Sequence, residues 1–197
     1  RHSPKQITNN GVNTMQTNTI KTDELSKVDE IEKSKIYIAC LSSYTSGVLH
    51  GSWIEPKTDK DELEAQIAEV LKSSPDPDAE EYAIHDYDNF PNLGEYPDLD
   101  KVIEVVEAIK LHGVKAVEGF IEHWSVEDLE HFDEAFHGTY DSFAEFAEDY
   151  AEDCILADCP ENIKYYIDYK QIEHELAFDF MECKADNYKV HIFNKNW

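Results

Sequence analysis

One stretch of the chain, residues 116–163, constrains the fold more than any other feature. Its 48 residues include 15 Asp and Glu residues and no Lys or Arg. Apolar side chains recur through it at helical spacing, which predicts amphipathic helices that each bury one face. The acids must then share the opposite faces, although like-charged pairs one turn apart destabilise a helix by about 0.2–0.5 kcal/mol each. Folding alone therefore does not explain this composition.

Residues 142–155 predict a single helix, because apolar or small residues recur through them at helical spacing. Its acids, at positions 145, 148, 149, 152 and 153, form one stripe opposite the apolar residues. At about 1.5 Å of rise per residue the five charges span on the order of 13 Å, or about 2.5–3 Å per charge. Duplex DNA carries one charge per about 1.7 Å of its axis. Helices side by side with such stripes can therefore imitate a phosphate backbone, whereas the alternative is an acidic face that only keeps the protein soluble.

The candidate partner-binding residues are the carboxylates of this stretch, taken together as a surface rather than as a catalytic site. They are Glu118, Glu122, Glu127, Asp128, Glu130, Asp133, Glu134, Asp141, Glu145, Glu148, Asp149, Glu152 and Asp153.

The charge of the whole chain points to a basic partner. The sequence has 43 Asp and Glu against 17 Lys and Arg, a formal net charge of −26. Nucleic-acid binding depends on Lys and Arg that neutralise phosphates, so this balance argues against it and against binding to an anionic membrane surface. No apolar run approaches the roughly 18 residues of a membrane-spanning helix.

Residues 1–35 are nearly neutral, rich in Asn, Thr and Ser, and without a hydrophobic signal core, which predicts a flexible N-terminal extension and a cytoplasmic protein. Cys40, Cys154, Cys159 and Cys183 form no CxxC pair. We expect them to be small buried residues in a reducing compartment, and a metal or disulfide role is the alternative.

The chain beyond the extension begins with an α+β pattern. Apolar, β-prone runs at 36–41 and 48–54 predict a hairpin, and residues 81–87 predict a third strand. Between them a helix should begin at Asp59 or the residue before it. These elements predict an α+β domain over residues 36–96.

Residues 97–135 predict a helical domain. A helix that begins at Leu99 should end at Gly113, and two shorter helical patterns follow, the second capped by Ser125.

Residues 136–197 predict helices packed on a small sheet. Gly138 is interpreted as a break between the central helical patterns and the helix that follows. The strands are expected at 178–183 and 188–193, joined by a turn at Asp186. The predicted fold class is therefore α+β.

The sequence contains no positive indication of an enzyme, a cofactor or a metal. There is no HExxH, DxDxDG, GxSxG, P-loop or GxGxxG motif. His123 and His131 lie eight residues apart in an acidic region, where surface histidines are the expected interpretation. We therefore predict a protein without catalytic activity, and a carboxylate hydrolase with a divalent metal stays open as a third hypothesis.

Several short segments, in order and spacing, resemble the ArdA antirestriction proteins over residues 36–197. They are residues 36–44 (IYIACLSSY), 47–54 (GVLHGSWI), 81–87 (EYAIHDY), 93–96 (LGEY), 138–143 (GTYDSF) and 166–169 (YIDY).

The resemblance implies an elongated, three-domain homodimer encoded by mobile genetic elements, with its dimer contact in the domain at 136–197. It also implies a DNA mimic that occupies the DNA-binding groove of type I restriction–modification enzymes, so that DNA is neither cut nor modified. The alternative is an acidic module that binds another basic DNA-binding protein, such as a nucleoid protein or another defence nuclease.

Overall fold

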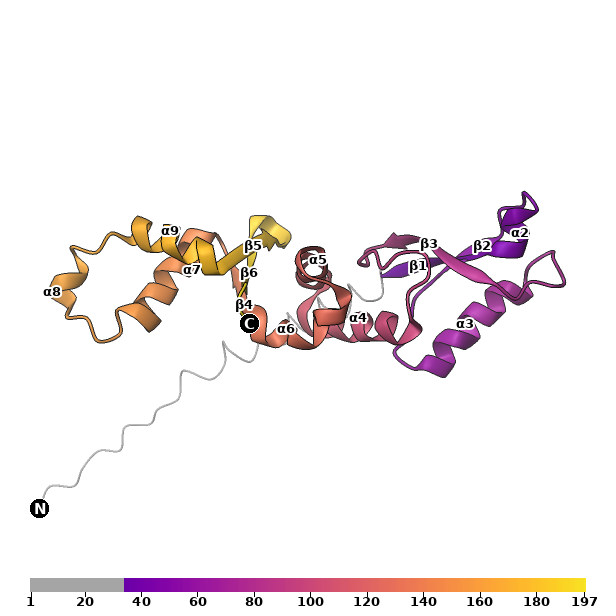
Figure 1. Ribbon diagram of the computed structural model, residues 1–197, viewed down its shortest axis with the longest axis horizontal. Helices are drawn as coiled ribbons and strands as arrows, with labels where there is room; N and C mark the ends of the chain where they lie inside the picture. Colours follow the sequence, from indigo (N-terminus) through magenta and orange to yellow (C-terminus); the bar gives the residue numbers. More distant parts are fainter. Residues whose placement is uncertain (1–33) are drawn as a thin grey trace, which may run out of the picture.

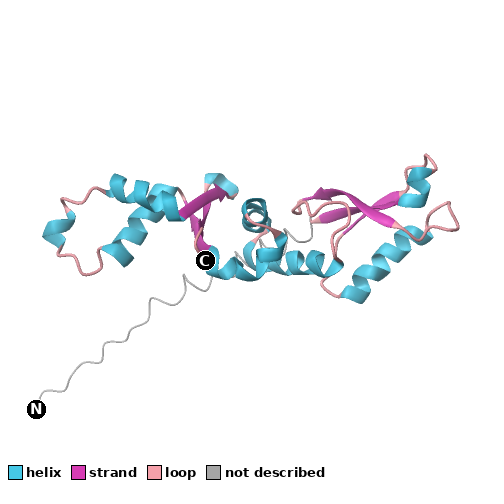
Figure 2. Ribbon diagram, in the orientation of Figure 1, coloured by secondary structure: helices cyan, strands magenta, loops and turns pink. Residues whose placement is uncertain are grey.

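The computed structural model describes residues 34–197 and shows an elongated molecule (Figure 1). One three-stranded sheet lies at one end, helices lie in the middle, and a second three-stranded sheet with further helices forms the other end (Figure 2). The predicted α+β class is confirmed. Of the extension predicted over residues 1–35, residues 1–33 lie outside the described residues, so their predicted flexibility stays a prediction. No helix within 34–197 has both the length and the apolar composition needed to cross a bilayer.

The N-terminal sheet consists of β1 (Lys35–Cys40), β2 (Gly51–Ile54) and β3 (Tyr82–Asp88) in the order β2-β1-β3, with both pairs antiparallel. The predicted hairpin and third strand are confirmed. The hairpin connection contains a short helix, α2 (Leu41–Thr45), and β1 begins at Lys35, the last residue of the predicted extension. The helix α3 (Lys60–Lys72) follows β2 and contacts both β1 and β2.

The α3 helix begins where the sequence predicts. The Asp59 side chain accepts a hydrogen bond from the backbone N–H of Glu62 at 3.0 Å, which satisfies one of the unpaired N–H groups of the first turn. Its buried side chains, Leu63, Ile67 and Val70, belong to the same hydrophobic cluster as Ile36, Ile38 and Ile84 of the sheet.

The middle of the molecule is helical, as predicted. It consists of α4 (Leu99–His112), α5 (Val114–His123), the 3₁₀-helix η1 (Val126–His131) and the single turn α6 (Phe132–Ala135). Gly113, at a φ of +86°, separates the first two helices, because this backbone conformation is readily available only to glycine.

The C-terminal sheet has the order β4-β6-β5, with β4 (Phe136–Tyr140), β5 (Phe180–Lys184) and β6 (Val190–Asn194). The strands β5 and β6, and the turn between them, η3 (Asp186–Tyr188), confirm the prediction. The interpretation of Gly138 as a break is wrong. It lies inside β4 at an irregularity of the pairing with β6 and has a φ of +115°.

The second helical region contains α7 (Phe143–Tyr150), η2 (Ala151–Ile155), α8 (Glu161–Lys164) and α9 (Tyr169–Asp179). The single helix predicted over 142–155 is therefore wrong in its second half, because η2 is a π-helix. There a backbone N–H bonds the carbonyl five residues earlier rather than four, which widens the turn.

Two hydrophobic clusters meet at the C-terminal sheet. Successive β6 residues point to opposite faces, so Ile192 packs with α7 and α9 while Phe193 joins the cluster of the central helices, where its ring lies 5.9 Å from that of Phe120. The larger cluster runs without interruption from the N-terminal sheet through α6. The boundaries between the three domains therefore stay predictions.

Candidate partner-binding surface

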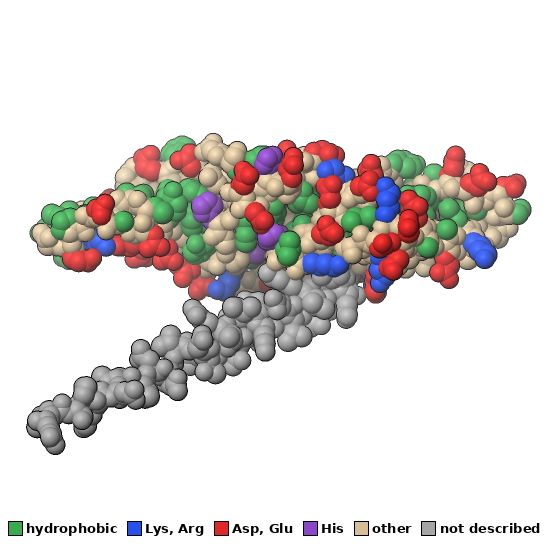
Figure 3. Space-filling model, turned by 90° about the horizontal axis from the view of Figure 1, so that it is seen from below, with side chains coloured by type: hydrophobic (Ala, Val, Ile, Leu, Met, Phe, Trp, Pro, Cys, Tyr) green, Lys and Arg blue, Asp and Glu red, His purple; other side chains and the backbone are tan. Residues whose placement is uncertain are grey.

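None of the thirteen candidate carboxylates is buried. Ten are exposed, and Glu118, Asp128 and Glu152 are half-buried. They lie on α5, η1, α6, α7 and η2 and in the turn before α7, so they extend from the middle of the molecule toward its C-terminal end. Figure 3 shows acidic side chains distributed along the long axis on the face seen from below.

The central group of acids is exposed because the 3₁₀ spacing of η1 and the start of α6 turns every third residue inward. Leu129 and Phe132 are 8% and 3% exposed, which leaves Glu127, Glu130 and Asp133 on the solvent side. Three carboxylates thus share one ridge at three-residue spacing.

The structure adds Glu104 and Glu107 of α4, which sequence reasoning missed. They face η1 and α6 across a groove of about 340 Å³, which we call the α4–η1 groove. The helix that carries them also carries Lys101 and Lys110, so it does not stand out as acidic. The usable signal was their helical spacing, which places both on one face of α4. The groove is lined by Lys101, Glu104, Glu107, Ala108, Leu111 and His112 from α4, and by Glu127, Leu129, Glu130, Phe132 and Asp133.

The acids of α7 are held in place by its N-terminus. The Ser142 hydroxyl accepts a hydrogen bond from the backbone N–H of Glu145 at 3.2 Å, and the Glu145 carboxylate accepts one from the backbone N–H of Asp141 at 2.6 Å. This arrangement is similar to a capping box, except that Glu145 binds the N–H of the residue before the cap, and it gives Glu145 a structural role as well. Glu148 and Asp149 are exposed further along the helix.

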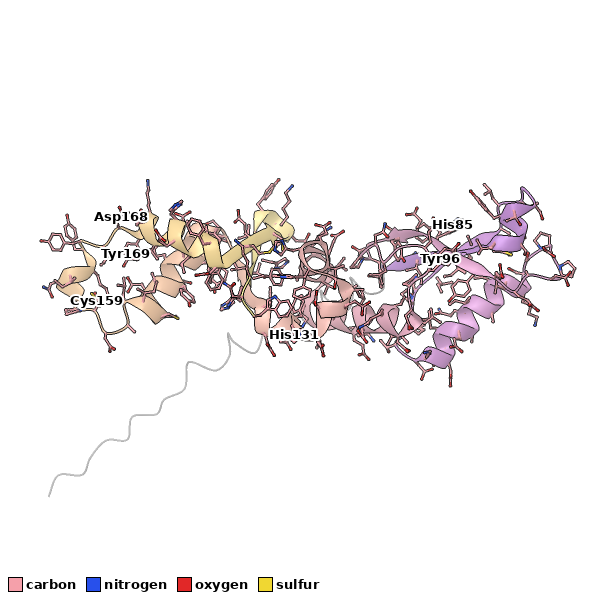
Figure 4. The ribbon with its side chains drawn as sticks, in the orientation of Figure 1. His85, Tyr96, His131, Cys159, Asp168 and Tyr169 are labelled. Carbon is pink, nitrogen blue, oxygen red and sulfur yellow. The ribbon has the colours of Figure 1, made fainter. Side chains whose placement is uncertain are left out.

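The predicted five-acid stripe is wrong at Glu152. The wider turn of η2 takes this residue out of line with the α7 acids, and its carboxylate lies 2.5 Å from the Lys164 Nζ and accepts a hydrogen bond from the Tyr169 hydroxyl. Figure 4 shows Tyr169 where α9 begins, beside the α8 segment. The hydrogen bonds that Lys164 and Tyr169 donate to Glu152 lower its pKa, and the hydrogen bonds that Lys164 donates to Glu152 and Glu161 raise the pKa of Lys164.

Lysines that lie outside residues 116–163 in the sequence form ion pairs with carboxylates inside that stretch. Besides the Glu152 pair, Lys115 lies 2.5 Å from Glu118 and Lys101 lies 3.5 Å from Glu127. Lys189 similarly approaches Asp141, at 2.6 Å. Within residues 34–197 the other nine candidates form no ion pair with lysine, although Asp133 lies 3.2 Å from His112 and both Glu130 and Glu134 lie 3.8 Å from His131. Because none has a lysine partner, we call them the unpaired carboxylates: Glu122, Asp128, Glu130, Asp133, Glu134, Glu145, Glu148, Asp149 and Asp153.

A family model described as Antirestriction protein (ArdA) matches residues 36–187, from β1 to η3. This chain belongs to the ArdA antirestriction family. The comparison with curated proteins gave no match. Membership gives the chain an antirestriction function and indicates interaction with restriction enzymes. All thirteen candidate carboxylates lie inside the matched region.

The two histidines singled out in this ArdA family member take part in aromatic packing. The His131 ring stacks on Trp197, with centroids 4.6 Å apart, and the His123 ring meets Trp124 edge-on at 4.6 Å. Among the residues that the structure describes, no three His, Cys, Asp or Glu side chains are grouped so as to hold a metal ion.

The four cysteines differ in burial. Cys40 is buried, as predicted, whereas the same prediction is wrong for Cys154, which is exposed, and for Cys159 and Cys183, which are half-buried. Burial alone would raise the pKa of Cys40, but hydrogen bonds from Ser42, Ser43 and other donors outweigh it and lower the pKa to about 6. Burial raises the pKa of the half-buried Cys183 to about 12.

Proposed function

We propose that this ArdA family member inhibits restriction as a DNA mimic. It occupies the DNA-binding groove of a type I restriction–modification enzyme in the cytoplasm, so that DNA is neither cut nor methylated, and it acts by stoichiometric binding rather than by catalysis. The observation that carries the proposal is the set of unpaired carboxylates, eight of them exposed, along an elongated body. A basic groove that binds DNA through phosphates attracts such a surface.

The density of charge supports this proposal. Glu145, Glu148 and Asp149 lie within four residue steps, or about 6 Å of helix, which corresponds to roughly 2–3 Å per charge. This is close to the spacing of about 1.7 Å per charge along the duplex axis. Because the carboxylates are fixed on helices, a basic groove can engage them with little ordering cost.

We further propose that two copies associate through the C-terminal helical end. Large apolar side chains are exposed there: Ile155, Ile163, Tyr165, Tyr166 and Phe178, at 52%, 45%, 87%, 80% and 66%. An association at this end would leave the acids of both central regions accessible and double the length of the mimic.

A displacement assay tests the mimicry. A type I methyltransferase is loaded with a fluorescent duplex that carries its recognition sequence, and fluorescence anisotropy follows release as the protein is added. We expect displacement at low salt that weakens as salt rises, because ion pairing drives the binding. An absence of displacement at low salt would refute the proposal. Binding to a nucleoid protein or another defence nuclease, without displacement of DNA from the methyltransferase, would favour the alternative partner.

Two variants of equal net charge show whether the unpaired carboxylates matter. The first, Glu148→Gln/Asp149→Asn/Asp153→Asn, removes three unpaired charges, and we expect a loss of at least about tenfold in inhibitory potency. The second variant is the matched control and removes three charges that already have lysine partners: Glu118→Gln/Glu127→Gln/Asp141→Asn. It should lose less. Equal losses would mean that only total charge counts.

A further inference from the structure

The α4–η1 groove combines an apolar floor with an acidic rim. Leu129 and Phe132, 8% and 3% exposed, lie at its floor together with the half-buried Ala108. The groove is open to solvent and has a volume of about 340 Å³. A surface that served only to stay hydrated would have no reason to keep an apolar hollow among its charges.

The rim carries more negative charge than its neighbours neutralise. The Lys101 Nζ lies 2.8 Å from Glu104 and 3.5 Å from Glu127, so one lysine serves two carboxylates. His112, which also lines the groove, lies 3.2 Å from Asp133, and His131 lies 3.8 Å from Glu130. Within residues 34–197, neither Glu107 nor Glu130 forms an ion pair with lysine, although both line the groove. A cation that enters would therefore meet carboxylates from both walls.

The chemistry of the groove matches one kind of side chain. An arginine has an aliphatic stem that packs on apolar surface and a planar guanidinium that binds carboxylates in a fork. Lysine offers a compact and strongly hydrated charge, which gains less from an apolar floor. Proteins that bind DNA phosphates present arginines along their grooves.

We propose that the α4–η1 groove receives an arginine side chain from the DNA-binding surface of the restriction enzyme, with its stem over Ala108 and Phe132 and its guanidinium between Glu107 and Glu130. The inference rests on the proposed function and deepens it. A few side chains that fill pockets supply most of the binding energy in many interfaces, and the arginine in this groove would be one of them.

Matched variants separate an anchor from diffuse charge in the displacement assay. Glu107→Gln and Glu148→Gln each remove one exposed charge, and Ala108→Leu fills the groove without changing charge, with Ala144→Leu on α7 as its control. We expect Glu107→Gln and Ala108→Leu to weaken displacement by at least about tenfold. The two α7 variants should change it by less than about threefold. Circular dichroism confirms that each variant is folded.

Direct binding of a probe tests the occupant. In the isotope-labelled full chain, N-acetylarginine amide should shift the backbone amide signals of α4 and η1 around the groove, and N-acetyllysine amide should shift them less at equal concentration. Equal shifts from the two probes, or shifts spread over all acidic helices, would overturn the inference. The inference would also be overturned if Glu107→Gln and Glu148→Gln weakened DNA displacement equally and Ala108→Leu left displacement unchanged. If the wild-type chain itself displaces no DNA, the proposed function fails instead.

Discussion

At the scale of single residues, acids that look alike in the sequence differ in their surroundings. Glu152 and Asp153 are neighbours, yet the first binds Lys164 and Tyr169 while the second is exposed. The partners of Glu152 follow it by 12 and 17 positions and are brought back by the turn through α8. The number of free carboxylates on the surface is thus set by the fold as well as by composition.

The substitution Glu152→Gln tests this pair through its pH dependence. Because the folded-state pKa of Glu152 is below its ordinary value of 4.5, the pair stabilises the protein above that pH, and its contribution is lost as pH falls through the folded-state value. The variant should melt below the wild type by up to about 4 °C at neutral pH. In thermal unfolding measured by circular dichroism, the gap should close under acid conditions.

The control for this prediction is Asp153→Asn, which removes the adjacent unpaired charge. It should leave the melting temperature unchanged or raise it slightly, since only repulsion is lost. A gap between wild type and Glu152→Gln that widens as pH falls would contradict the assignment.

At the scale of elements, close contact between α5 and β5 depends on a glycine. Gly119 is buried in α5, although glycine costs about 1 kcal/mol relative to alanine inside a helix. A Cβ at this position would collide with the Cys183 Sγ and lie 3.0 Å from the Cys183 Cβ. The glycine therefore lets the central helix approach the C-terminal sheet, where the larger hydrophobic cluster reaches Phe193.

The substitution Gly119→Ala should destabilise the protein by about 1–3 kcal/mol, because it overpacks this contact. Combining it with Cys183→Ala, which removes the colliding sulfur, should recover part of the loss, so the two effects should not add. Urea unfolding of both single variants and the double variant measures the coupling. Strictly additive free energies of unfolding would show that the two residues do not constrain each other.

At the scale of the whole molecule, the protein separates two kinds of surface along its length. Unpaired carboxylates occupy the central region and α7, while exposed aromatic side chains cluster around α8 at the far end. Association through α8 must overcome repulsion between two chains of net charge −26 each. Salt should therefore act in opposite directions on self-association and on binding to a basic enzyme.

Sedimentation velocity of the full chain measures the self-association. We expect a dimer whose dissociation constant falls as salt rises, and the double substitution Tyr165→Lys/Tyr166→Lys should weaken it by at least about tenfold. Tyr188→Lys is the control, because the Tyr188 side chain is at least as exposed as those of Tyr165 and Tyr166 but lies on η3. A monomer at all salt concentrations, or a dimer that the double substitution leaves unchanged, would rule out this interface.

Much of the fold followed from local sequence. The cap Asp59, the break at Gly113 and the apolar periodicities predicted α3, α4 and the start of α7, because each depends on residues within one or two turns. The strand β4 was missed. It is short, contains Gly138, and is stabilised by pairing with β6, which lies about 50 residues away in the sequence. The π-helical turns of η2 likewise have no local signal in the sequence.

The sequence by itself determined that this protein is acidic, helical through its middle and without Lys or Arg over residues 116–163, because charge and periodicity are properties of the residues themselves. Only the tertiary structure decided which acids keep their charge unpaired. Four lysines from outside that stretch form ion pairs with its carboxylates. Glu104 and Glu107 of α4 line a groove together with acids of the stretch. Coulomb interactions depend on distance in space, and long-range packing sets that distance.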